Sequence, residues 1–250
     1  MTRTPQAALY AIAPIAYTWG DHDFAGNDAD GTAVSRPAAL QVYRSYVPHY
    51  PLMDGADSPI FQAFTVGDVR FVLTDNRSMR DPPGTAARSM LGSEQRGWLI
   101  DELAQAGRYG LVVWANADPW VDRQDPTNDT WAGFDQERRT IADAIAAHRV
   151  DNLLMVSGDA HMLAYDDGTN TDYSTSQDSG FPLLQAAALD RKPSVKGGPY
   201  TGPVIPGGGQ FATVLVRDDG ERVRVTMKGR NWKDEVLFTR TFQTSRDPGE

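Results

Sequence analysis

The clearest fold signal in this sequence is the stretch Leu153-Leu154-Met155-Val156-Ser157-Gly158-Asp159-Ala160-His161. Its first four residues form an apolar run without polar alternation, which is typical of a strand covered on both faces. The run leads into Gly-Asp-x-His, and ligand sites of open α/β sheets gather where strands end in such loops. Side chains two residues apart in an extended loop can turn toward one point, so Asp159 and His161 can share a cation. Mixed carboxylate and imidazole ligands suit divalent and trivalent metal ions.

A second run near the start of the chain, Gly20-Asp21-His22-Asp23, also places carboxylates beside an imidazole. It lies in a stretch rich in Gly, Asn and Asp, which predicts a loop over residues 21–37. Asp side chains also stabilise turns through their own oxygens, so turn formation is the structural alternative for both runs. The two runs together indicate a candidate site with carboxylate and imidazole groups.

Composition limits the classes of function. The chain has 250 residues, of which 40% are hydrophobic and 23% charged, as in ordinary soluble domains. A net charge of −9 argues against a general nucleic-acid-binding surface, which would be basic. There is no Cys, so neither disulfides nor thiolate ligands contribute. No apolar run is long enough to span a membrane, and the first residues lack the pattern of an export signal.

Helix and strand signals alternate up to the Leu153 strand, and strands dominate the end of the chain. The pattern predicts helices over residues 39–46, 94–106 with Ser93 as N-cap, and 136–147. It predicts strands over residues 61–66, 69–74, 111–114, 153–156, 211–216, 222–227 and 236–242. Residues 165–210 are expected to be mostly loop. We therefore expect an α/β fold with mixed sheets, as one domain over residues 1–243 with a flexible tail at 244–250.

Four motifs in a fixed order carry a family resemblance. They are Thr18-Trp19-Gly20-Asp21-His22-Asp23-Phe24 with Asn27-Asp28, Leu73-Thr74-Asp75-Asn76-Arg77-Ser78 with Arg80, Leu91-Gly92-Ser93-Glu94-Gln95 with Trp98-Leu99, and Ser157-Gly158-Asp159-Ala160-His161. Together they resemble the PhoD-like alkaline phosphatases, a branch of the calcineurin-like metallophosphoesterases, over roughly residues 17–164. The resemblance implies a layered metallophosphoesterase-like α/β sandwich. It also implies hydrolysis of small-molecule phosphate monoesters or diesters by a water that two metal ions, calcium and/or iron, activate.

The resemblance assigns roles to individual residues. It implies metal ligation by Asp21, Asp159 and His161, with Asn116 as a further ligand in the loop after the 111–114 strand. His22 would donate a proton to the leaving group, and Asp23 would orient His22. The remaining two candidates, Asn27 and Arg77, would contact the substrate. For Arg77 the alternative is an ion pair that fixes the strand exit to a neighbouring carboxylate.

The sequence also departs from the family pattern. Gly20 stands where the family has Asp, and the two metal motifs on the family's first two strands have no counterpart before Asp21. We therefore expect a fold that is incomplete at its N-terminus. Two alternatives to an active phosphatase follow: a non-catalytic or partner-dependent remnant that self-associates through uncovered sheet edges, and a calcium-binding module on the acidic loops 21–30 and 166–172. Relatives are commonly exported, so the resemblance implies an extracellular or periplasmic location.

Overall fold

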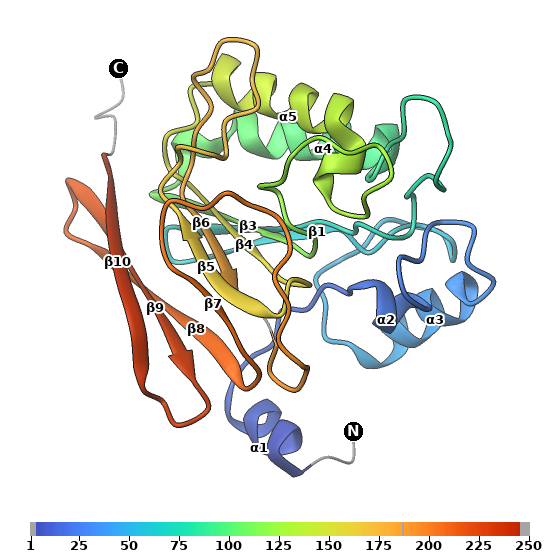
Figure 1. The fold of residues 1–250 in the computed structure, drawn as a ribbon, viewed down its shortest axis with the longest axis horizontal. Coiled ribbons are helices and arrows are strands. Elements are labelled where there is room, and N and C mark those ends of the chain that lie inside the picture. Colours follow the sequence, from blue (N-terminus) through green and yellow to red (C-terminus); the bar gives the residue numbers. More distant parts are fainter. Residues whose placement is uncertain (1–3, 187, 246–250) are drawn as a thin grey trace.

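Two β-sheets form the centre of the structure, a computed structural model that describes residues 4–186 and 188–245 (Figure 1). The larger sheet has seven strands in the order β1-β2-β3-β4-β6-β5-β7, and the smaller has three in the order β10-β9-β8. The strands are β1 (Gln62–Val66), β2 (Val69–Leu73), β3 (Leu111–Asn116), β4 (Leu153–Ser157), β5 (Met162–Asp166), β6 (Leu183–Ala186), β7 (Val204–Pro206), β8 (Gln210–Asp218), β9 (Arg222–Asn231) and β10 (Val236–Ser245). The α-helices are α1 (Thr4–Ile12), α2 (Asp21–Phe24), α3 (Arg36–Tyr46), α4 (Gly92–Ala104) and α5 (Asp135–Ala147).

The larger sheet is mixed. Strands β2, β3, β4 and β6 run parallel, whereas β1, β5 and β7 each pair antiparallel with a neighbour. Gly67 turns β1 into β2 with a φ of 59°, a backbone conformation that favours glycine. The smaller sheet is an antiparallel meander. The predicted α/β fold with mixed sheets is therefore confirmed.

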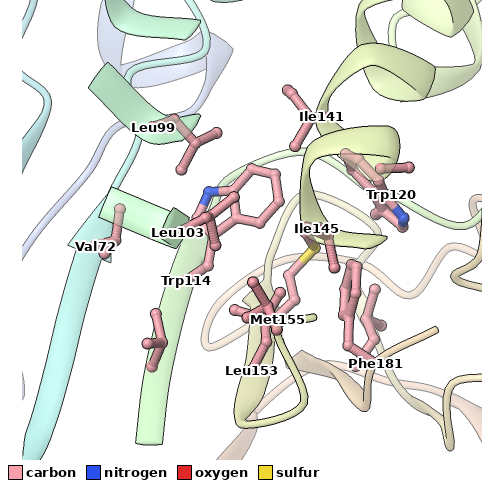
Figure 2. Packing of buried hydrophobic residues seen from close by; sticks show 14 of the residues in the cluster. Val72, Leu99, Leu103, Trp114, Trp120, Ile141, Ile145, Leu153, Met155 and Phe181 are labelled. Atoms are coloured by element: carbon pink, nitrogen blue, oxygen red, sulfur yellow. The ribbon is translucent and has the colours of Figure 1, made fainter. Parts of the chain in front are cut away.

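The larger sheet is covered on both faces, which explains the apolar runs of its central strands. Figure 1 shows α4 and α5 on one face and the three-stranded sheet on the other. Toward the helices, Trp114 and Met155 pack with Leu103 and Ile141 in one buried cluster (Figure 2). On the opposite face, side chains of β3, β4 and β6 pack against β9 and β10; they include Val113, Leu154, Leu184, Val225, Met227 and Phe238. Successive residues along one strand therefore point to opposite faces of the sheet and belong to two different hydrophobic cores.

A smaller cluster fixes the N-terminal segment beside the sheet. Trp19, Phe24, Leu40, Tyr43 and Ile60 are all buried there, between α2, α3 and the residues before β1. The Trp19 indole donates a hydrogen bond to the Asp75 carboxylate just after β2, at 2.7 Å. This bond holds residues 20–23 near the carboxyl ends of the parallel strands.

Several predicted boundaries were wrong. Residues 21–24 form the short helix α2 rather than loop, and α3 begins at Arg36 because Pro37 fits the first helical turn. Helix α4 begins at Gly92, so Ser93 lies inside it and is not the N-cap.

The stretch expected to be mostly loop contains strands, including β6 between β4 and β5. Strand β10 continues through Thr244, which was placed in the tail; its hydroxyl donates to the Gly110 carbonyl oxygen at 2.8 Å. Residues 246–250 lie outside the described residues. None of the helices in the described part of the chain is long and apolar enough to cross a membrane.

Candidate functional site

A hollow of about 1080 Å³ opens at the carboxyl ends of β3 and β4 and extends toward β8. The parallel strands end side by side, so the residues that follow them meet at one edge of the sheet. Asp21, His22, Asp159 and His161 all line this hollow. The structure thus brings the two sequence runs together around a single space.

One wall of the hollow is the short helix α2. Asp21 is buried, and its two carboxylate oxygens accept hydrogen bonds from the backbone N–H groups of His22, at 2.7 Å, and Asp28, at 3.0 Å. Burial alone would raise the pKa of Asp21, but the Asp28 hydrogen bond and the Arg77 charge outweigh it and hold the pKa below its usual value. His22 is exposed at the rim. This wall therefore presents an ionised carboxylate and an accessible imidazole.

Asp23 also lines the hollow, whereas Asn27 lies outside the part of its lining that the structure describes. The Asp23 carboxylate accepts a hydrogen bond from the Gly20 backbone N–H at 3.2 Å, which stabilises the start of α2. Among the residues that the structure describes, Asp23 makes no hydrogen bond to His22, so its orienting role stays a prediction. Asn27 is exposed in the turn after α2 and is not among the described residues that line the hollow.

The opposite wall is the loop after β4, and its backbone is strained. Asp159 has a φ of 64° and His161 a φ of 46°, values that residues other than glycine rarely adopt. Hydrogen bonds from neighbouring loops hold this conformation: Gly158 N–H donates to the Ala117 carbonyl oxygen at 3.1 Å, and Ser194 donates to the carbonyl oxygens of residues 160 and 161. Strain of this kind clusters at functional sites, where the surrounding structure maintains it.

Lys196 connects the Asp159 wall to the loop that carries Asp129. Its ammonium lies 2.9 Å from an Asp159 carboxylate oxygen and 3.5 Å from an Asp129 carboxylate oxygen. Burial and the nearby Asp118 raise the pKa of Asp159, and Lys196 opposes that rise. Asp28 shares a hydrogen bond with Asp129, and this contact raises the pKa of Asp28 to about 6. The chain Asp28–Asp129–Lys196–Asp159 therefore links the two walls.

A buried ion pair lies behind the site. Arg77 is fully buried and forms a salt bridge with the buried Asp118, and it donates to the Ala29 carbonyl oxygen at 3.2 Å. Arg80 lies 3.8 Å from Asp118, and burial lowers the pKa of Arg80 to about 10. The geometry favours the alternative for Arg77, an ion pair that fixes the strand exit, because no face of its guanidinium reaches the hollow.

Asn116 ends β3 and lines the hollow, yet its amide is already engaged. Its oxygen accepts from Asn76, at 2.5 Å, and from the Trp131 indole, at 3.0 Å, and its nitrogen donates to the Asp118 carbonyl oxygen. Metal ligation by Asn116 stays a prediction that requires one of these bonds to break.

Three carboxylates and one lysine near the site were not predicted as site residues from the sequence. Asp75 accepts from Trp19 and from the Ile60 backbone N–H, while Asp118, Asp129 and Lys196 form the ion pairs described above. The only indication of Lys196 in the sequence was its place in a long loop rich in Pro and Gly, because long loops of this kind are usually functional. Nothing in the local pattern singled out Asp129.

The donor chemistry suits a metal ion, but the arrangement does not form a complete site. Among residues 4–186 and 188–245, no group of three or more His, Asp or Glu side chains converges as a metal site would require. The oxygens of Asp21 already accept backbone hydrogen bonds, and Asp159 is paired with Lys196.

The second acidic loop offers no better cation site, because its carboxylates fold the loop. Asp166 accepts from Gly168, Asn170 and Thr201. Asp172 accepts from two serines of the same segment, Ser174 and Ser179. The calcium-binding alternative therefore gains no support from the geometry.

Comparison with known proteins agrees with this fold. Residues 3–186 match the family profile described as PhoD-like phosphatase. Alkaline phosphatase D of Bacillus subtilis (strain 168) is 27% identical over 191 residues, which cover 62% of this chain and 32% of that protein. A solved structure of PhoD superposes with a TM-score of 0.62 at 16% identity, covering 92% of this chain and 55% of the other. This chain thus spans about a third of the length of the Bacillus relative.

Proposed function

The chain belongs to the PhoD-like phosphatase family, and from this membership we propose that it hydrolyses phosphate esters at the hollow between α2 and the loop after β4. The observation that carries the proposal is that the two carboxylate–imidazole runs, far apart in sequence, line one hollow at the carboxyl ends of parallel strands. Such an edge is where α/β folds place ligands. The substrate is a small-molecule phosphate monoester or diester, and the location proposed from the family is outside the cytoplasm.

The residues of this chain support separate parts of the reaction. His22 is exposed at the rim, and histidine is the side chain that most often serves as a general acid, so it suits proton donation to the leaving alkoxide. Arg191 lines the hollow, and Lys196 and the buried Arg77 pair with carboxylates next to it, so positive charge near the site reduces repulsion of an anionic phosphate. Family members are generally metal-dependent, and the assay below includes that requirement.

The direct test is hydrolysis of p-nitrophenyl phosphate and of its bis-ester, each with and without added calcium and iron. We expect turnover of at least one ester, with Asp159→Ala reducing it to background, because Asp159 is the central carboxylate of the second wall. Ser176→Ala, an exposed change in the 167–182 loop, is the matched control. If the unmodified chain turns over neither ester above the Asp159→Ala background under any metal condition, the proposal fails.

A second candidate is a non-catalytic, partner-dependent form of the same fold. It is favoured by the lack of three convergent metal ligands in the described part of the chain and by the pairing of Asp159 with Lys196. Elemental analysis separates the two candidates. Two tightly bound metal ions per chain would rule out the non-catalytic form, whereas a metal-free chain without turnover would favour it.

A further inference from the structure

The hollow is large for a site that binds a phosphate group alone, and its lining changes in chemistry from one part to another. Its volume of about 1080 Å³ exceeds the range of about 300–1,000 Å³ that is usual for small-ligand pockets. Carboxylate and imidazole side chains of α2 and of the loop after β4 line one part. Apolar side chains of β4, β6 and β8 line another; they are Val156, Leu184, Ala186, Phe211, Ala212 and Val214. The hollow therefore has separate places for a charged group and for an apolar group.

The apolar part is an opening in the hydrophobic core between the two sheets. Val156, Leu184 and Ala212 belong to the cluster that packs the sheets together. Val214 lies directly opposite Met227 in the pairing of β8 with β9, so both side chains point to the same face of the small sheet. Met227 is fully buried, whereas Val214 is 38% exposed because it borders the hollow. Apolar surface that faces the larger sheet is therefore accessible from the hollow.

A loop that is fixed to the start of β8 also bounds the hollow, through residues 188–191. The Gln210 N–H donates to the Ala188 carbonyl oxygen at 3.2 Å, and Ala188 has a φ of 73°, which residues other than glycine rarely adopt. A Cβ at Gly208 would lie 2.7 Å from the Arg191 carbonyl oxygen, so glycine permits this close approach of the two segments. The boundary of the hollow is therefore formed before a ligand binds.

We propose that the apolar part of the hollow binds the organic group of the substrate, so that the chain prefers phosphate esters of apolar alcohols or phenols at least as large as an aromatic ring. The phosphate would lie in the polar part, beside His22, and the organic group against the side chains of β4, β6 and β8. The inference deepens the proposed function and rests on it in one respect, namely that the phosphate occupies the polar part.

The physical basis of the preference is the removal of apolar surface from water. An apolar ring that enters this part of the hollow covers its own surface and that of side chains such as Val214, and both changes favour binding. A polar organic group of the same size would give up hydrogen bonds to water, and the apolar side chains of the strands cannot replace them. The lining therefore discriminates between organic groups while the polar part binds the phosphate that they share.

The test compares the binding of methylphosphonate with that of 2-naphthylmethylphosphonate. Hydrolysis of a phosphate ester does not break a P–C bond, so the comparison is independent of turnover. Isothermal titration of the intact chain with each compound, in the buffer of the hydrolysis assay, gives the two Kd values. We expect the naphthyl compound to bind about tenfold or more tightly. Tenfold corresponds to about 1.4 kcal/mol, which the burial of roughly 55 Å² of apolar surface supplies at ~25 cal/mol per Å².

Two neighbouring residues of β8 give a matched pair of variants. Val214→Gln should lose most of the preference for the naphthyl compound, because it places an amide in the apolar part of the hollow. Leu215→Gln introduces the same side chain on the opposite face of the strand, where Leu215 lies opposite Thr226, and should keep the preference. Ala212→Phe fills the apolar part instead of making it polar. It should weaken binding of the naphthyl compound and leave the Kd of methylphosphonate unchanged.

Circular dichroism shows whether each variant is folded, and Ala212→Phe decides the question if Val214→Gln is not. Equal Kd values for the two phosphonates, an equal loss of preference in Leu215→Gln, or no binding of either phosphonate would overturn the inference. Failure of ester hydrolysis together with the expected preference would overturn only the proposed function. Ester hydrolysis without the preference would overturn only the inference.

Discussion

At the scale of single residues, the carboxylates of the site are arranged around a buried guanidinium. Arg77 pairs with Asp118, and Asp21, Asp159 and Asp129 also act on it electrostatically. Although burial alone would lower the pKa of Arg77, these carboxylates together hold it above its usual value. One buried cation therefore stabilises the acidic groups of both walls.

We expect Arg77→Met to lower the free energy of unfolding by about 3–5 kcal/mol, because it leaves the Asp118 carboxylate buried without its partner. Urea denaturation measures the change. The double variant Arg77→Met with Asp118→Leu should recover part of the loss, since it removes both buried charges. Arg139→Met, which breaks an ion pair of an exposed arginine on α5, is the control and should cost about 1 kcal/mol or less. A loss in Arg77→Met no larger than in Arg139→Met would contradict this role.

For the reaction, we expect His22→Ala to reduce turnover of the p-nitrophenyl esters about 10²- to 10⁴-fold, because a general acid contributes that much. The side chain is exposed, so the Tm should remain unchanged. His148→Ala, at an exposed position just after α5, is the matched control and should retain full activity. Comparable activity in both variants would show that His22 has no part in the chemistry.

Four residues that the sequence singled out, Asp21, His22, Asp159 and His161, line one hollow, and their roles stay predictions. The run at residues 157–161 follows a strand with a clear apolar signal, and the run at residues 20–23 was singled out by its adjacent carboxylates and imidazole alone. Lys196 could not be found in this way. Its partners are 37 and 67 residues away in the sequence, and only the folded chain brings such groups together.

At the scale of elements, prediction was accurate where the apolar pattern of the element was clear. Strand β4 and helix α5 were placed to within one residue. Strand β6 was missed because it has only four residues and follows Pro182 in a loop-like stretch. Pairing on both sides, with β4 and β5, supplies the order that its own sequence does not indicate. Helix α2 was also missed because it is short: a single helical turn has too few residues to show the repeating apolar pattern of a helix.

Helix α5 is tied to the segment before α4 by Glu137. This buried carboxylate accepts from the Ser89 hydroxyl and from the backbone N–H groups of Met90 and Leu91. Burial raises its pKa above the usual value of 4.5, although these hydrogen bonds oppose the rise. The folded state therefore holds the Glu137 proton more tightly than the unfolded chain, so this proton's contribution to stability is complete below pH 4.5 and is lost as the pH rises.

We accordingly expect the stability difference between the unmodified chain and Glu137→Gln to shift against the unmodified chain as the pH rises from 4 to 7. Glutamine is neutral throughout, so the variant lacks this titration. Urea denaturation of both proteins at each pH gives the difference. Gln136→Glu adds a carboxylate at the neighbouring position of α5. It is the control for how much a glutamate at another position changes the stability difference over the same pH range. A difference that is constant or grows in favour of the unmodified chain would contradict the raised pKa.

At the scale of the whole molecule, the three-stranded sheet covers one face of the larger sheet and has two edge strands of its own, β8 and β10. Strand β8 pairs only with β9 among the described strands, and Val214 and Leu215 on it are 38% and 50% exposed. An edge of this kind presents unpaired backbone groups to other chains. The resemblance predicted uncovered sheet edges, but which strands form the edges follows only from the order of the strands.

We expect the chain to self-associate with rising concentration through the β8 edge, and Leu215→Lys to weaken that association because a charged edge residue opposes strand pairing. Sedimentation velocity over a concentration series measures it. Val34→Lys makes the same exchange at a fully exposed position in the turn before α3 and should leave association unchanged. A monomer at every concentration would contradict self-association. Equal association of Leu215→Lys and the unmodified chain would place the contact on a surface other than the β8 edge.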